Sequence, residues 1–425
     1  MMSSRFAAWR AAAPGLAMAL AWAMAAAAHA AQTPLTLDEA VRQGTARAPL
    51  LAASSADIDA AREEAMRAGR LPDPSLTAGV SNYPVTGPGA FGIASDPMTM
   101  RTLGVMQAIP SRASREAERG LADARIGAAE AQRTLTAQAV HQRVAEAWIA
   151  LWAAQRKRDL LEELRGESVL AVTLTQARLR GGVGSAADAL AARAEAAALD
   201  NRIAGVDAER AAARAGLQRW LGDPAPTLAE APDFDRLPVS PDELEQDVDR
   251  QAPLQAWQAR EQLAQAELDR ARAAKHPDWS VSASYGQRAL GRPDMVMLQV
   301  GVSLPLFTRN RQDRGISARQ AQRDAVAFAH EDARRAQREA VARAIADWQG
   351  WGAQLARYRD TLLPLDHDRV SAALAAYRGG GGLQPWLDAR RDQIEHRLAY
   401  ADALAAHARA WAALAYLMPS EESAP

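Results

Sequence analysis

The chain of 425 residues contains no cysteine, few aromatic residues and only two lysines, Lys157 and Lys275. Without cysteine it has no disulfides, thiolate metal sites or cysteine nucleophiles, and we expect no lipid-modified N-terminal cysteine. Aromatic residues make up 5% of the chain, which argues against a large globular core. A GC-rich genome accounts for most of the preference for arginine over lysine. These shortages favour long packed helices over an ordinary globular domain.

Charge and motifs exclude further classes. The net charge is -1 with both signs interspersed, so the chain has no basic stripe for nucleic acid. The sequence contains no nucleophile elbow, phosphate loop or metalloprotease motif, and the histidines after His29 have no ligand spacing. We therefore expect a protein that is not an enzyme, binds no nucleic acid and holds no cofactor.

The first thirty residues have the pattern of a secretory signal peptide. Arg5 and Arg10 precede an apolar stretch from about Leu16 to Ala28, and Ala28-His29-Ala30 forms a cleavage site. The alternative is a membrane anchor, but a spanning helix needs about 20 apolar residues and this stretch is shorter. We expect export with cleavage after about Ala30.

Two long segments have a helical pattern until each meets a run of glycines, and the first, Ser114–Arg180, contains no proline. Ser114–Arg180 can form one helix of about 67 residues and about 100 Å, and Arg311–Arg378 is similar. The glycine breaks after Arg180 and Arg378 then turn the chain into the shorter helices Ala186–Trp220 and Gln384–Leu417. Because each shorter helix covers half the height, Asp242–Ala274 and Leu37–Arg70 are expected to supply the other halves.

The sequence contains an internal repeat of two copies. Thr45–Ala78 aligns with Asp249–Ala283, and GVMQAIPSR aligns with GVSLPLFTR, in the same order as the two glycine breaks. This repeat predicts the following division: signal peptide 1–30, first repeat 31–221, equatorial linker 222–241, second repeat 242–419 and disordered tail 420–425. Within the repeats we expect β-hairpins at about 73–110 and 278–307, and long helical hairpins at about 112–221 and 310–418.

Each repeat also contains segments with a period of two. In MVMLQVGVSLPL, Val296, Leu298 and Val300 alternate with small or polar residues, as strands do. Each hairpin then has two strands of roughly ten residues, the length of a tilted membrane-spanning strand. Four strands cannot close a barrel alone, so oligomerisation would be required. The alternative is an ordinary amphipathic hairpin packed on the helices.

Several segments together resemble the TolC-type outer-membrane efflux proteins. They are TLDEAV, LPDPSL, HPDWSV and the paired segments RGGVGSAADAL and RGGGGLQPWLDA, and the resemblance covers essentially everything after Ala31. It implies a mainly α fold with a membrane β-barrel. Three protomers would form a twelve-stranded outer-membrane barrel, continued by a periplasmic α-helical barrel of long coiled-coil helices.

DPMTMRTLGVMQAIP (Asp96–Pro110) is similar to the heavy-metal branch of that family, the cobalt-zinc-cadmium and copper-silver efflux proteins. It departs from the branch pattern at Met106 and Ala108. The resemblance implies a passive outer-membrane duct that exports heavy-metal cations. Its partners would be a periplasmic adaptor, an inner-membrane resistance-nodulation-division transporter and outer-membrane lipid. The alternatives are a multidrug or type I secretion duct and, from another class, a soluble periplasmic coiled-coil adaptor or scaffold.

Charged residues beside the glycine breaks are candidate gate residues. In the family an aspartate in this place faces the closed periplasmic end of the tunnel, which suggests Asp188 and Asp388. Three copies would surround a narrow pore with carboxylates, which favours cations. Arg180 and Arg378 could pair with these aspartates. The alternatives are a capping box with Ser185 for Asp188 and a solvated helix end for the arginines.

Two further sets of residues are candidates. The glycines permit close approach of an adaptor hairpin: Gly181, Gly182, Gly184, Gly379, Gly380, Gly381 and Gly382. Thioethers bind soft cations, so the methionines on the expected lumen face could touch departing metal: Met98, Met100, Met295 and Met297. Filling of the lumen is the alternative for the methionines, and no dedicated metal site is expected.

Overall fold

The computed structural model describes residues 34–223, 227–288 and 291–418. The signal peptide expected at 1–30 and the tail expected at 420–425 lie outside these residues. The chain divides into two compact units, each assembled from distant segments. Unit 1 contains residues up to Ala48, Val140–Pro238 and Ile345–Ala415, and unit 2 contains Pro49–Ala139, Val239–Ala344 and the residues from Tyr416. No helix among the described residues has the length and hydrophobicity needed to cross a membrane.

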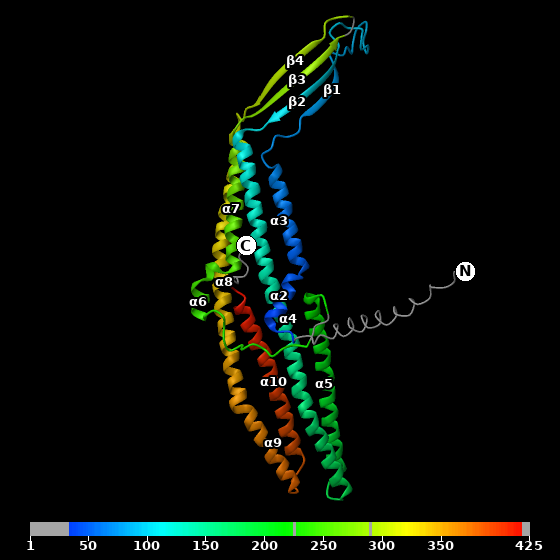
Figure 1. Ribbon diagram of the computed structural model, residues 1–425, viewed down its shortest axis with the longest axis vertical. Coiled ribbons are helices and arrows are strands. Elements are labelled where there is room, and N and C mark those ends of the chain that lie inside the picture. The colour runs from blue at the N-terminus through cyan, green and yellow to red at the C-terminus, as the bar shows by residue number, and fades with distance from the viewer. Residues whose placement is uncertain (1–33, 224–226, 289–290, 419–425) are drawn as a thin grey trace, which may run out of the picture. The chain divides into compact units, whose positions relative to one another are not determined.

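Helices account for most of the structure (Figure 1). In chain order they are α2 (Leu37–Ala46), α3 (Pro49–Arg67), α4 (Arg112–Arg180), α5 (Ala186–Leu221), α6 (Pro241–Gln246), α7 (Ala252–Ala273), α8 (Gln312–Arg357), α9 (Leu363–Arg378) and α10 (Gln384–Ala415). Three short turns accompany them: η1 (Val248–Arg250), η2 (Thr308–Asn310) and η3 (Tyr358–Leu362). The strands are β1 (Ser75–Ser81), β2 (Met100–Ile109), β3 (Asp278–Arg288) and β4 (Met295–Ser303).

Unit 2 holds the sheet and the helical segments next to it. The strands form one four-stranded antiparallel sheet in the order β1-β2-β3-β4, so the second hairpin pairs with the first through β2 and β3. Salt bridges join neighbouring helices in the order α3, α4, α7 and α8. They are Arg62 to Glu130 at 2.9 Å, Arg270 to Glu118 at 2.7 Å and Arg319 to Glu267 at 2.7 Å. The helices of unit 2 are thus laid side by side rather than around a central core.

Unit 1 contains the glycine turns and two clusters of buried apolar side chains. One cluster joins α4, α9 and α10, with Trp386, Tyr377 and Val370 among its members. The other joins α4, α5 and α10, where Leu164, Leu199 and Ile394 meet. Each cluster is a stripe along the helices, as expected for a chain with so few aromatic residues.

An aromatic cluster holds the linker between the two halves of the chain. The ring of Phe234 lies edge-on to Trp152 at 5.4 Å and to Trp411 at 5.3 Å between centroids. The indoles of Trp348 and Trp411 donate hydrogen bonds to linker carbonyls, those of Phe234 at 2.9 Å and Arg236 at 2.7 Å. The segment around Phe234 is therefore fixed to α4, α8 and α10 of unit 1.

Serine and threonine caps explain where several helices begin. Ser185 accepts a hydrogen bond from the backbone N–H of Asp188 at 3.0 Å, which confirms the predicted cap of α5. Thr36 and Ser240 cap α2 and α6 in the same way. The helix predicted from Ser114 to Arg180 begins slightly earlier, at Arg112, and is otherwise unbroken.

Two of the predicted helices are interrupted in the structure, and a proline explains each interruption. The sequence predicts one helix over Arg311–Arg378, but the structure has a π-helical turn, Tyr358–Leu362, between α8 and α9. Pro364 follows it and cannot donate the hydrogen bond of a regular helix, so the wider turn accommodates the lost donor. The helix predicted over Leu37–Arg70 is likewise split, at Arg47 and Ala48, because Pro49 disfavours helical backbone in Ala48.

Candidate functional site

The sheet has two unlike faces. In the strand register, Val105 lies opposite Leu76 and Ala283, and Val281 lies opposite Val300. Side chains alternate along each strand, so this face is apolar across all four strands. Its exposed apolar members are Leu76, Val80, Leu103, Val105, Trp279, Val281, Tyr285, Val296, Leu298, Val300 and Val302. The exposed Arg101 lies on the same face at one end of β2. An apolar surface of this extent is a contact surface for another apolar medium or partner.

The opposite face is small and polar. Thr77, Gly104 and Ser284 lie side by side: a Cβ on Gly104 would lie 3.0 Å from Ser284 Cβ and 3.1 Å from Thr77 Oγ1. A Cβ on Gly301 would similarly lie 2.6 Å from Ser280 Oγ. Larger side chains here would collide with the neighbouring strand. The face is therefore kept thin and hydrophilic.

The methionines singled out from the sequence lie near one end of this polar face. The register places Met100 opposite Arg288, and Met295 opposite Gly286, so Met100, Met295 and Met297 share the face. Met100 is 9% exposed and covers Gly286, whereas Met98 precedes β2 and is 59% exposed. In the described residues, no group of three or more histidine, aspartate or glutamate side chains is arranged to hold a metal ion.

The two glycine turns, Gly181–Gly184 and Gly379–Gly382, lie together in unit 1 and are here termed the paired turns (Figure 1). The guanidinium of Arg178 lies 4.5 Å from the centroid of the Tyr377 ring, and its Nη1 donates a hydrogen bond to the Tyr377 carbonyl. Gly182 has φ of 73° and Gly380 has φ of 100°, a region that favours glycine. Each turn thus needs glycine for its left-handed backbone conformation, and Arg178 joins the two turns by contacting Tyr377.

An aromatic pair underlies the second turn. Tyr377 and Trp386, on either side of the glycines, stack with centroids 5.6 Å apart and are 2% and 1% exposed. Burial raises the pKa of the Tyr377 phenol, Arg178 opposes the rise, and the charge of Asp188 adds to it. Asp188 of α5 is therefore close enough to α9 to act on it electrostatically.

The predicted gate residues have different surroundings. Asp388 accepts a hydrogen bond from Gln384 at 2.8 Å and pairs with Arg391 at 3.5 Å, and not with Arg378. Within the described part of the protomer, the exposed side chains of Arg180 and Arg378 form no ion pair. Their pairing with Asp188 and Asp388 across protomers stays a prediction.

Arginines that sequence reasoning missed connect the helices near the paired turns. Arg390 of α10 is 5% exposed, and donates to Glu167 at 3.0 Å and to the Leu164 carbonyl at 3.2 Å on α4. Burial lowers the pKa of the Arg390 guanidinium, and the charge of Glu167 opposes this. Arg391 binds Glu195 of α5. Helix α10 therefore reaches both α4 and α5 through consecutive arginines.

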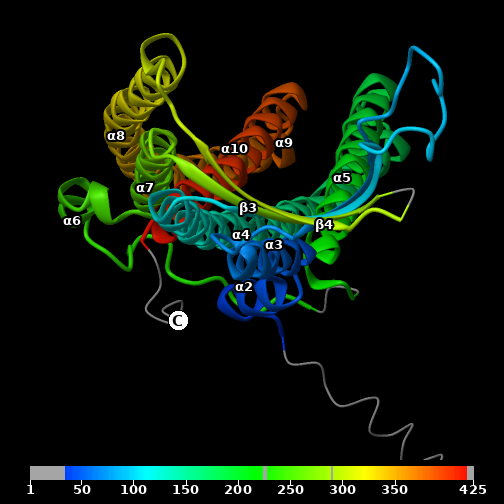
Figure 2. The ribbon, with the colours of Figure 1, turned by 90° about the horizontal axis from the view of Figure 1, so that it is seen from above.

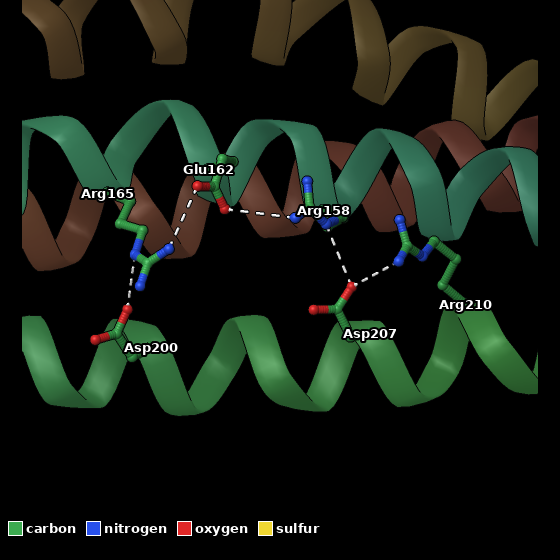
Figure 3. A network of polar contacts seen from close by, with 6 residues as sticks. All are labelled: Arg158, Glu162, Arg165, Asp200, Asp207 and Arg210. Carbon is green, nitrogen blue, oxygen red and sulfur yellow. Dashed lines mark hydrogen bonds and ion pairs between the residues drawn. The ribbon is translucent and has the colours of Figure 1, made fainter.

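Further ion pairs align α4 with α5 (Figure 3). Arg158 lies 3.2 Å from Asp207, and Arg165 lies 3.0 Å from Asp200. Glu162 lies between the two arginines and contacts both, at 3.8 Å and 3.5 Å. Exposed pairs each contribute about 0–1 kcal/mol, so the set fixes helix register more than it stabilises the fold.

In unit 2 an open hollow of about 850 Å³ lies between α4, α7 and α8. Four carboxylates line it, those of Glu116, Asp123, Glu261 and Asp269, together with the single cation Arg323. Three of these carboxylates already have basic partners: Glu116 contacts Arg112 at 2.7 Å, Asp269 contacts Arg272 at 3.0 Å and Glu261 contacts His330 at 2.7 Å.

Comparison with known proteins identifies relatives of most of the chain. The family model described as outer membrane efflux protein matches residues 40–223 and 244–418. The cobalt-zinc-cadmium resistance protein CzcC of Cupriavidus metallidurans is 26% identical over 301 residues, which is 68% of each chain.

Solved structures share the fold at low sequence identity. A membrane protein from Pseudomonas aeruginosa superimposes with a TM-score of 0.75 at 20% identity, covering 90% of this chain and 93% of its own. CusC, described as forming a transmembrane channel, gives 0.72 at 19% identity over 91% and 93%. The outer membrane protein VceC of Vibrio cholerae gives 0.70 at 18% identity over 90% and 95%.

Proposed function

Because the chain belongs to the outer membrane efflux protein family, we propose that it is the passive outer-membrane duct of a tripartite pump for heavy-metal cations. The observation that carries this proposal is the sheet with one apolar and one polar face. Its edge strands β1 and β4 lack a partner within the described chain. Edges and apolar face are both satisfied when three copies close a twelve-stranded barrel in a lipid bilayer.

The helices would continue this barrel into the periplasm. Both the first and the second half of the chain have a strand hairpin, a long helical segment, a glycine turn and a returning helix. This order supports an internal duplication. Alanine-rich helices laid side by side can close into a ring with the helices of neighbouring copies. We assign the equatorial position to the linker 222–241, which the Phe234 cluster holds.

The paired turns would form the periplasmic end. There Asp188 and Asp388 line the closed pore, and Arg180 and Arg378 remain available to neighbouring copies. The glycines at Gly181–Gly184 and Gly379–Gly382 offer bare backbone for a helical hairpin of a periplasmic adaptor. An inner-membrane resistance-nodulation-division transporter would supply the energy, since a passive duct has no means of coupling.

One observation favours metal cations as cargo: the relative CzcC is a cobalt-zinc-cadmium resistance protein. We propose transient passage past Met98, Met100, Met295 and Met297 rather than tight binding, because an exit duct gains nothing from retaining its cargo.

Deletion of the gene tests the cargo. We expect reduced growth on zinc, cobalt or cadmium, restored by the intact gene, with tolerance to a panel of organic drugs unchanged. Lost drug tolerance with normal metal tolerance would instead assign the duct to drugs. Recovery of the mature chain in the soluble periplasm, rather than in outer-membrane fractions, would contradict the duct itself and favour an adaptor or scaffold.

A further inference from the structure

The connection between β1 and β2, residues 82–99, is tied at its β2 end to the polar face of the sheet. Arg288 of β3 shares that face with Met100, its partner in the register, and with Gly286, which Met100 covers. The Nε and Nη2 atoms of Arg288 donate hydrogen bonds to the carbonyl of Pro97 at 3.1 Å and 2.7 Å. In Figure 2 the connection lies on the concave side of the sheet. Arg288, a side chain of the polar face, thus holds the β2 end of the loop at that face.

The loop has a defined internal structure. The Tyr83 hydroxyl donates to the Phe91 carbonyl at 2.7 Å, and the Phe91 N–H donates to the Pro84 carbonyl at 2.8 Å. Ser95 Oγ donates to the Gly89 carbonyl at 2.6 Å. At the base of the loop, the Thr99 hydroxyl, only 1% exposed as a residue, closes onto the Asn82 carbonyl at 2.9 Å. These hydrogen bonds fix the backbone of the loop, including the backbone of Phe91.

This ordered loop presents apolar side chains to its surroundings. Phe91 is 70% exposed, Val85 is 62% and Ile93 is 42%. Asp96 is the only charged residue between Asn82 and Thr99, and its carboxylate is occupied by the Met98 N–H at 2.7 Å. Within the described chain the Tyr83 ring lies edge-on to Phe91 at 6.4 Å between centroids and leaves most of Phe91 uncovered. The exposure of these apolar side chains predicts a contact that a single copy does not contain.

We propose that three copies of this loop meet over the outer mouth of the duct and form an apolar constriction centred on Phe91. The inference rests on the proposed trimeric barrel, in which the polar face lines the lumen. A loop held at that face leans toward the axis, where its neighbours are the same loops of the other copies. A constriction lined by apolar side chains opposes the passage of hydrated ions, because water leaves it readily. Arg288 holds the loop in this position.

Conductance in planar bilayers tests the constriction. Phe91→Ser should raise the single-channel conductance of the purified trimer several-fold, and Arg288→Ala should raise it by releasing the loop. Phe328→Ser, the same substitution at a comparably exposed phenylalanine of α8, should leave conductance unchanged. Equal conductance of the intact protein and both loop variants would overturn the inference. Absence of channels from the intact protein would contradict the proposed function instead.

Crosslinking gives an independent test, since the chain contains no cysteine. Identical residues of a ring approach one another only near its symmetry axis. Phe91→Cys should therefore give dimers linked between copies on oxidation or with a short bismaleimide, whereas Phe328→Cys should not. If Phe91→Cys trimers of normal size stay uncrosslinked under both treatments, the loops do not meet and the inference is wrong.

Discussion

Arg390 shows how a single buried residue can join two helices at the candidate gate. Its guanidinium satisfies a carboxylate and a carbonyl on α4 while lying among the buried side chains of α10. Glu167, its ionic partner, has a side chain that is 46% exposed. Removal of the arginine would therefore leave the carboxylate hydrated, and the main loss would be the hydrogen bonds and the packing.

Arg390→Ala should lower the apparent free energy of unfolding by about 2 kcal/mol, the range for hydrogen bonds to charged groups. Arg390→Met should lose less, because its side chain refills the space. Urea denaturation followed by circular dichroism measures both. Arg409→Ala on the exposed side of the same helix is the control, with an expected change within about 0.5 kcal/mol. An equally small change for Arg390→Ala would show that the buried contacts do not stabilise the fold.

At the scale of elements, the paired turns convert long helices into helical hairpins. Gly182 has a backbone that an L-residue adopts only with strain, whereas Gly181 has an ordinary one. A Cβ on Gly181 would lie no closer than 3.5 Å to its neighbours. Two adjacent glycines thus differ in what they require.

Gly182→Ala should therefore destabilise the first turn by about 1 kcal/mol, the cost of left-handed backbone. Gly181→Ala should have little effect and serves as its matched control. Hydrogen exchange of the amides at 178–186 reports on the turn directly, and should be faster in Gly182→Ala alone. Equal exchange in the two variants would mean that the turn tolerates another backbone conformation.

The strands and the long helix α4 were predictable because their signals are local. Period two in residues 295–303 follows from a sheet with unlike faces, and α4 follows from the lack of proline over its length. The predicted helix Arg311–Arg378 was wrong at the π turn, because Pro364 lacks the N–H that a regular helix requires. Tyr377 and Trp386 stand on either side of the glycines in the sequence, and this placement indicates that the two rings can meet when the chain turns.

On the scale of the whole molecule, contacts between distant segments could not be read from one sequence. Arg178 and Tyr377, or Arg390 and Glu167, meet only because α4, α9 and α10 pack together, and nothing local to these residues specifies their partners. The same limit applies between copies. The pairing of Arg180 and Arg378 with neighbouring aspartates stays a prediction that the assembled ring must test.

If Asp188 and Asp388 close the pore, Asp188→Ala and Asp388→Ala should raise the cation conductance of the trimer in planar bilayers. The cap of α5 survives the first change, because Ser185 accepts from the backbone N–H and not from the carboxylate. Glu209→Ala, an exposed carboxylate elsewhere on α5, is the control and should have no effect. Unchanged conductance in both aspartate variants would show that neither carboxylate gates the pore.

The open edges of the sheet make a single copy prone to aggregation before it assembles. In water, a single copy exposes unpaired backbone groups on β1 and β4 beside a continuous apolar face. These are the features that recruit strands of other chains into aggregates. If the chain is exported and trimerises as proposed, a carrier would have to shield its strands until they reach lipid, and its stability would depend on the concentration of other copies. In the proposed assembly, the risk of aggregation is therefore greatest before the strands insert into lipid.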